Sequence, residues 1–142
     1  MKLDKILLIH GPNLNLLGTR EPDIYGQDSQ DKLFRFIDSS FPEIKFIFFQ
    51  SNHEGVIIDR LHDSRNLVDA IIINAGALSH YSYAIRDAIK AINIPTIEVH
   101  LSNINERESF RSNLVLSDVC LETICGKGKQ GYLDAINKLK DI

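Results

Sequence analysis

The sequence predicts a doubly wound α/β domain, in which helices cover both faces of a five-stranded parallel sheet. Short apolar runs alternate with segments of helical periodicity along the whole chain, which is the pattern of repeated βαβ units. The chain has 142 residues, of which 44% are hydrophobic and 25% charged. This is the size and composition of one globular domain, so we expect residues 1–142 to form a single domain.

The first half of the chain is expected to supply three strands and two helices. Lys5–His10 is apolar until its last residue, as in a strand that is covered on both faces. Ser29 can cap a helix that ends near Pro42. Ile44–Gln50 is the second strand, and Asp69–Asn74, after the second helix, is the third. The apolar residues at helical spacing in the two helices are Leu33, Phe34, Ile37 and Phe41, then Ile57, Ile58 and Leu61.

The second half supplies the remaining strands. Ser79 or Ser82 opens a helix whose core-facing residues are Ala84, Ile85, Ala88, Ile89 and Ile92. The fourth strand, a short helix, the fifth strand and the last helix follow at Pro95–Val99, near Asn105–Ser112, at Val119–Cys125 and from about Lys129. Right-handed crossovers leave few topologies for five parallel strands, and they favour the flavodoxin-like order 2-1-3-4-5.

Composition argues against several classes of partner. A formal net charge of -3 lacks the basic surface that nucleic acid requires. No apolar stretch reaches the roughly 20 residues that span a membrane, and the first ten residues resemble a strand rather than a signal peptide. We therefore expect a cytoplasmic protein. Cys120 and Cys125 are expected to remain reduced, because their odd spacing places them on opposite faces of a strand.

Polar residues follow the carboxyl ends of the predicted strands, where open α/β sheets bind ligands. Glu98 and His100 are two apart on a strand and therefore share a face. Glu98 could orient His100 for acid–base work, although a surface ion pair would look the same in sequence. The histidines show no zinc-like spacing, so we expect no metal.

The segment Gly11–Gly26 is far longer than a usual βα connection and is typical of a lid or binding loop. Within it, Arg20 and Tyr25 are five residues apart. A guanidinium near a phenol lowers the phenol pKa, so Tyr25 could act as a base. On spacing alone, a packing tyrosine and a solvated arginine remain the alternative.

Other functions fit less well. Gly126–Gly131 matches G-x-G-x-x-G, but the chain ends at Ile142, before the acidic residue that a dinucleotide site needs. A serine hydrolase would need a G-x-S-x-G elbow, which is absent. A phosphoacceptor receiver would need acidic residues where Pro12, Asn13 and Asn74 stand. A small-ligand binding module without catalysis remains the alternative class.

Taken together, the motifs resemble those of type II 3-dehydroquinate dehydratases over essentially the whole chain. The matching segments are Gly11–Pro22, Tyr25-Gly26, Gln50–Gly55, Asn74–Ala77, Ser79-His80, Glu98–Asn103, Arg107-Glu108, Phe110-Arg111 and Gly126–Tyr132. The resemblance implies a catalytic domain that converts 3-dehydroquinate to 3-dehydroshikimate in the shikimate pathway, by anti loss of water through an enolate. It implies no cofactor, and a dodecamer built from four trimers.

The resemblance also implies roles for particular residues. Tyr25, assisted by Arg20, would be the base and His100, oriented by Glu98, the acid, with Asn13 stabilising the enolate through a water. The substrate would be held by Asn74, His80, Leu101, Ser102 and Arg111. Asp87 would reach the site of a neighbouring subunit. The imine route of the unrelated type I enzymes would need a lysine, and none of the strand-end motifs contains one.

Overall fold

The computed structural model describes residues 2–19 and 21–142. In this part of the chain, five strands form one parallel sheet in the order β2-β1-β3-β4-β5. The predicted fold class and strand order are therefore confirmed. The strands are β1 (Lys5–His10), β2 (Lys45–Gln50), β3 (Ala70–Asn74), β4 (Thr96–His100) and β5 (Glu122–Cys125).

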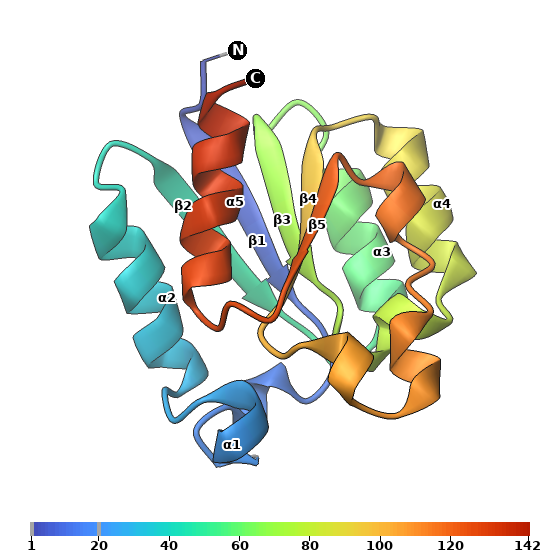
Figure 1. Cartoon of the computed structure of the whole chain (residues 1–142). Helices are drawn as coiled ribbons and strands as arrows, with labels where there is room; N and C mark the ends of the chain where they lie inside the picture. The colour runs from blue at the N-terminus through green and yellow to red at the C-terminus, as the bar shows by residue number, and fades with distance from the viewer. Residues whose placement is uncertain (1, 20) are drawn as a thin grey trace.

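Helices cover both faces of the sheet. In Figure 1, α2 (Gln30–Ser40) and α5 (Gln130–Lys140) lie on one face, whereas α3 (Glu54–Asp63) and α4 (Tyr83–Ile92) lie on the other. A short helix, α1 (Pro22–Tyr25), lies below α2, beyond the carboxyl ends of the strands. Short 3₁₀ helices occupy the loops: η1 (Leu14–Leu16), η2 (Gly76–His80), η3 (Ile104–Glu106), η4 (Ser109–Ser112) and η5 (Ser117–Val119).

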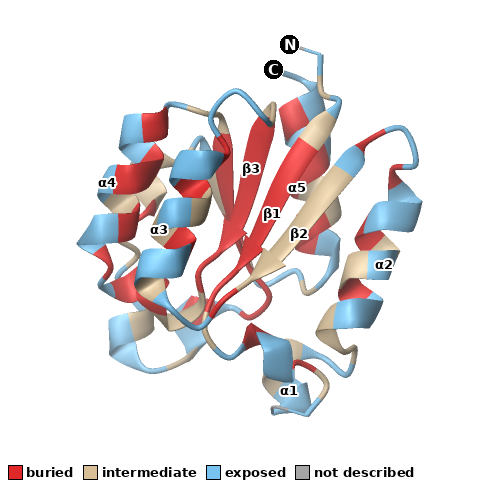
Figure 2. Ribbon diagram, turned by 180° about the vertical axis from the view of Figure 1, so that it is seen from behind, coloured by how far each residue is buried: buried red, intermediate tan, exposed pale blue. Residues whose placement is uncertain are grey.

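The central strands separate two apolar cores. Along β1, Ile6 and Leu8 join the core beneath α2 and α5, while Leu7 and Ile9 join the core beneath α3 and α4. This alternation follows from the two-residue period of a strand, and it explains why β1 and β3 read as unbroken apolar runs. Figure 2 shows both strands buried along most of their length, whereas the edge strand β2 is only partly buried.

The start of α4 is fixed by one of the two serines that the sequence offers. Ser82 is the N-cap, and its hydroxyl accepts a hydrogen bond of 3.0 Å from the backbone N–H of Ile85. Ser79 lies in η2 instead. The expectation that Ala84 faces the core is wrong, since Ala84 is exposed. It lies only one position from the buried stripe of Ile85, Ala88, Ile89 and Ile92.

The predicted fifth strand was too long at its start. Val119 ends η5, and β5 begins only at Glu122. Val119 and Cys120 lie in a loop and pack against the core beneath α3 and α4. Their apolar character therefore reflects this packing and not a place in a strand. The single short helix predicted near Asn105–Ser112 is divided into η3 and η4. The other strand ends match the prediction or differ from it by one residue, which is within the usual uncertainty of element boundaries.

The structure also bears on membrane-spanning helices and on the state of the two cysteines. Among the described residues, no helix is both long enough and apolar enough to cross a membrane. Cys120 and Cys125 are free thiols, and burial is the main cause that raises their pKa, to about 12 and about 11. Both thiols are therefore neutral at physiological pH.

Candidate active site

A cavity opens where β1, β3 and β4 end. Most of the predicted site residues line it, and it lies at the carboxyl edge of the sheet, as expected. Glu98 stands directly behind His100, whereas Asp87 lies away from the cavity, exposed on α4. Arg20 lies outside the described residues. The lining residues are Pro12, Asn13, Leu14, Tyr25, Asn74, Gly76, Ala77, His80, His100, Leu101, Ser102, Ile104, Arg107 and Arg111.

The centre of the site is a buried carboxylate–imidazole pair on β4. Nε2 of His100 lies 2.7 Å from Oε2 of Glu98, and both side chains are almost fully buried. A carboxylate accepts but does not donate, so Nε2 carries the hydrogen of this bond. The sequence prediction that the two residues share a face and interact is confirmed. Nδ1 is therefore the nitrogen of His100 that remains for a ligand.

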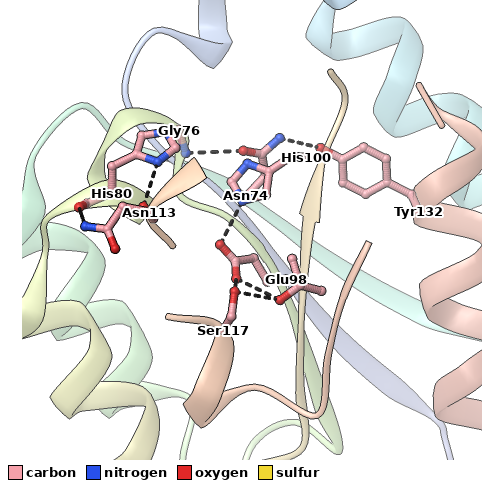
Figure 3. A network of polar contacts seen from close by, with 9 residues as sticks. Asn74, Gly76, His80, Glu98, His100, Asn113, Ser117 and Tyr132 are labelled. Atoms are coloured by element: carbon pink, nitrogen blue, oxygen red, sulfur yellow. Dashed lines mark hydrogen bonds and ion pairs between the residues drawn. The ribbon is translucent and has the colours of Figure 1, made fainter. Parts of the chain in front are cut away.

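Two hydroxyl groups hold the other oxygen of Glu98. Oε1 accepts hydrogen bonds of 2.9 Å from Ser117 and 3.0 Å from Thr123 (Figure 3). These donors satisfy a carboxylate that is fully buried, which would otherwise be costly. Sequence reasoning missed both residues. Thr123 is the register partner of Glu98 on β5 and could have been found from the strand pairing, whereas Ser117 carries no such signal.

His80 faces His100 across the cavity. Its Nδ1 lies 3.1 Å from the backbone oxygen of Asn113, so Nδ1 carries the hydrogen and Nε2 is left as an acceptor. The two imidazole rings lie 6.3 Å apart. Burial is the largest cause that lowers the pKa of His80, and the nearby His100 lowers it further. His80 is therefore neutral near pH 7 and can accept a hydrogen bond from a hydroxyl group.

Gly11 and Asn13 follow β1 directly and contact the segments after β3 and β2. Asn13 has a left-handed backbone, with φ of 70°, and its N–H donates to Oδ1 of Asn52 over 2.9 Å. Gly11 has no room for a side chain, because a Cβ there would lie 2.3 Å from the backbone oxygen of Ala75. Asn13, two residues after this close approach, lines the cavity.

Tyr25 enters the cavity from the end of α1, in the segment predicted to be a lid. The guanidinium of Arg107 lies over its ring, 5.0 Å from the ring centroid. Nε of Arg107 is buried without a hydrogen-bond partner among the described residues, and Nη1 lies 3.4 Å from the hydroxyl of Ser102. Sequence reasoning noted Arg107 only as part of a motif. Its role depends on a contact between distant segments, which spacing cannot reveal.

The remaining polar groups that line the cavity come from the segment after β4. Leu101 and Ser102 follow β4 directly and are buried. Arg111, in η4, bonds to Glu108 through Nε over 2.9 Å. The guanidiniums of Arg107 and Arg111 both pair with the single carboxylate of Glu108, so this group keeps a net positive charge, which suits an anionic ligand. Among the described residues, no group of three or more His, Cys, Asp or Glu side chains is arranged to hold a metal ion.

Comparisons with known proteins agree on one family. Residues 4–140 match the family described as "Dehydroquinase class II". A 3-dehydroquinate dehydratase of Caldicellulosiruptor saccharolyticus is 54% identical over 99% of both chains, and a catabolic 3-dehydroquinase of Botryotinia fuckeliana is 49% identical over 96% of this chain and 92% of the relative. The crystal structure of a type II dehydroquinase from Butyrivibrio crossotus superposes with a TM-score of 0.94, at 47% identity, over 97% of this chain and 98% of that one.

Proposed function

Because the chain belongs to the class II dehydroquinase family, we propose that it removes water from 3-dehydroquinate by anti elimination through an enolate, giving 3-dehydroshikimate. The chain is a type II 3-dehydroquinate dehydratase, a hydro-lyase.

In the proposed first step, Tyr25 removes a proton from the carbon next to the ketone. The negative charge that develops moves to the ketone oxygen and forms the enolate. Arg107 supports the role of Tyr25, because a cation close to a phenolate stabilises it. We assign the same effect to Arg20. Asn13, which lines the cavity, stabilises the enolate oxygen through a water molecule, a form of electrostatic stabilisation that often dominates catalysis.

In the second step, His100 donates a proton from Nδ1 to the departing hydroxyl, which leaves as water. The observation that carries this proposal is the 2.7 Å contact between Nε2 of His100 and Glu98, because it turns Nδ1 away from the carboxylate and stabilises the imidazolium. Tyr25 and His100 line the same cavity, as a base and an acid acting on neighbouring carbons must.

The other lining residues would bind the substrate. We assign the carboxylate of 3-dehydroquinate to the side chain of Asn74 and the backbone of Leu101 and Ser102. His80 and Arg111 would contact the ring hydroxyls, and the neutral His80 has an acceptor nitrogen available. Among the described residues that line the cavity there is no lysine, which supports an enolate rather than an imine route.

The decisive experiment is conversion of 3-dehydroquinate by chelator-treated protein, followed as the rise in ultraviolet absorbance of the conjugated product. Borohydride is added with substrate in a parallel reaction, because it traps an imine but not an enolate. We expect turnover that borohydride does not reduce. Inactivation by borohydride would overturn the enolate route. No turnover by folded protein would leave the alternative of a binding module.

We extend the proposal to a dodecamer of four trimers. Asp87 and Tyr83 lie one helical turn apart on α4, and both are exposed in the single chain. An exposed tyrosine beside a carboxylate is a suitable contact for a neighbouring subunit, and it supports the assignment of Asp87 to a neighbour's site. We place the assembly in the cytoplasm, where free thiols such as Cys120 and Cys125 persist.

A further inference from the structure

The amide of Asn74 ends a chain of hydrogen bonds that starts outside the cavity. Oε1 of Gln30 lies 2.8 Å from Nδ1 of His10, and Nε2 of His10 lies 2.8 Å from the hydroxyl of Tyr132. The same hydroxyl lies 3.1 Å from Nδ2 of Asn74. The four residues come from α2, β1, α5 and β3, and the link between Asn74 and Tyr132 is drawn in Figure 3. His10 and Tyr132 are fully buried and do not line the cavity.

The hydrogen bonds between these four residues can be donated in only one direction. Oε1 of Gln30 can only accept, so Nδ1 of His10 carries the hydrogen. Burial keeps His10 neutral at physiological pH, with a pKa of about 4, so Nε2 is an acceptor and the hydroxyl of Tyr132 donates to it. The oxygen of Tyr132 is then free to accept from Nδ2 of Asn74, while Oδ1 of Asn74 accepts from the N–H of Gly76 over 3.2 Å.

We propose that Gln30, His10 and Tyr132 are positioning residues, which fix the orientation of the Asn74 amide so that an N–H hydrogen remains for the substrate carboxylate. A flipped amide would set its oxygen against the oxygen of Tyr132, whose only hydrogen already points to His10. It would also set its nitrogen against the N–H of Gly76. The inference rests on the proposed function, because it takes the carboxylate of 3-dehydroquinate as the ligand of Asn74.

Steady-state kinetics of Tyr132→Phe test the proposal. Loss of the hydroxyl leaves the N–H of Gly76 as the one printed contact that still orients the amide among the described residues. The amide is then held less firmly, which weakens substrate binding but leaves Tyr25 and His100 in place. We expect KM for 3-dehydroquinate to rise about 10-fold, the effect of one lost hydrogen bond, with kcat within about twofold of wild type. A general loss of structure would instead lower kcat or the active fraction. An unchanged KM would overturn the proposal.

A double-mutant cycle separates positioning from packing. If Tyr132 acts through Asn74, then Tyr132→Phe in an Asn74→Ala background should change kcat/KM by less than about twofold, because the group it orients is gone. Additive losses would overturn the proposal.

Gln30→Met is the second variant, which keeps the length of the side chain and removes the acceptor without touching the cavity. Without this acceptor, the hydrogen of His10 is no longer fixed on Nδ1, and Nε2 is no longer held as the acceptor for Tyr132. We therefore expect KM to rise about 3- to 10-fold. Gln130→Met is the matched control, since Gln130 is exposed on α5 and bonds only to Asp134 among the described residues. It should leave KM unchanged. Inactive wild-type protein would contradict the proposed function itself, whereas an active wild type with unaltered variants would contradict only this inference.

Discussion

At the scale of single residues, the buried carboxylate of Glu98 holds His100, the residue that we propose as the acid. Its two oxygens meet His100 on one side and the hydroxyls of Ser117 and Thr123 on the other. Both oxygens of this fully buried carboxylate therefore have hydrogen-bond partners. The contact with Oε2 fixes the orientation of the His100 ring.

Glu98→Gln should lower kcat about 100-fold, because the neutral amide no longer stabilises the imidazolium that donates the proton. KM should change little, since Glu98 does not line the cavity. The measurement is steady-state turnover of 3-dehydroquinate at neutral pH. Glu122→Gln, on the neighbouring strand β5, is the matched control and should stay within about twofold of wild type. A kcat within threefold of wild type for Glu98→Gln would remove Glu98 from the mechanism.

His10 should make the fold sensitive to acid. Burial lowers its pKa from 6.5 to about 4, so between these values the unfolded chain binds a proton that the folded chain does not. The free energy of unfolding therefore decreases as the pH falls through this window, by about 3 kcal/mol in total from this group. His80, whose pKa is also lowered, acts in the same direction.

Urea unfolding at pH 7, 5.5 and 4.5 measures this dependence. The free energy of unfolding should depend less steeply on pH in His10→Gln, whose side chain does not titrate. The dependence should be unchanged in His62→Gln, which alters an exposed histidine. Parallel slopes for wild type and His10→Gln would show that His10 contributes nothing to the acid sensitivity.

Sequence reasoning identified those site residues whose signal is local. The two-residue spacing of Glu98 and His100 predicted their contact, because a strand places such residues on one face. It missed the contacts that Ser117, Arg107 and Tyr132 make with the site, because these depend on packing between segments far apart in the chain. The roles assigned to Tyr25 and Arg20 stay predictions.

At the scale of elements, the strand order followed from the alternation of strands and helices, since right-handed crossovers leave few arrangements. The boundaries were less predictable where apolar residues pack from loops. Val119 and Cys120 look like strand residues because they face a core, yet no neighbouring strand pairs with them among the described residues. Hydrophobicity reports burial, and only the backbone hydrogen bonds define a strand.

Two glycines make a matched test of the contact between β1 and β3. Gly11→Ala should lower the free energy of unfolding by about 3 kcal/mol or more, because the new Cβ would meet the backbone of Ala75, which cannot move aside cheaply. Gly55→Ala has open space within α3 and should raise stability by about 0.5 kcal/mol. Chemical unfolding of both variants checks this. Equal stabilities would mean that the strand ends adjust freely.

At the scale of the whole molecule, one edge of the sheet carries the site while α4 exposes Asp87 on a flank. Because we assign Asp87 to the site of a neighbouring subunit, substrate binding would depend on assembly. The cavity in the single chain already contains the proposed acid and base. The neighbour would therefore add to substrate binding rather than to proton transfer.

Light scattering should find a particle of about 190 kDa, the mass of twelve copies of this 16.1 kDa chain. Asp87→Asn should raise KM about 5-fold or more without dissociating that particle, since one charge-assisted contact to substrate is lost. Asp38→Asn, in an exposed position on α2, is the control and should change neither quantity. An active monomer would contradict the assembly, and an unchanged KM would contradict the role of Asp87.

The bond between His10 and Tyr132 joins residues 122 positions apart, almost the full length of the chain. A ribosome releases β1 and β3 before α5, so the partner that orients the amide of Asn74 is synthesised long after Asn74 itself. The strands can begin to pair before α5 is made, but the Asn74 amide cannot yet take its final orientation. Competence to hold substrate is therefore acquired only after α5 has emerged and packed on the sheet.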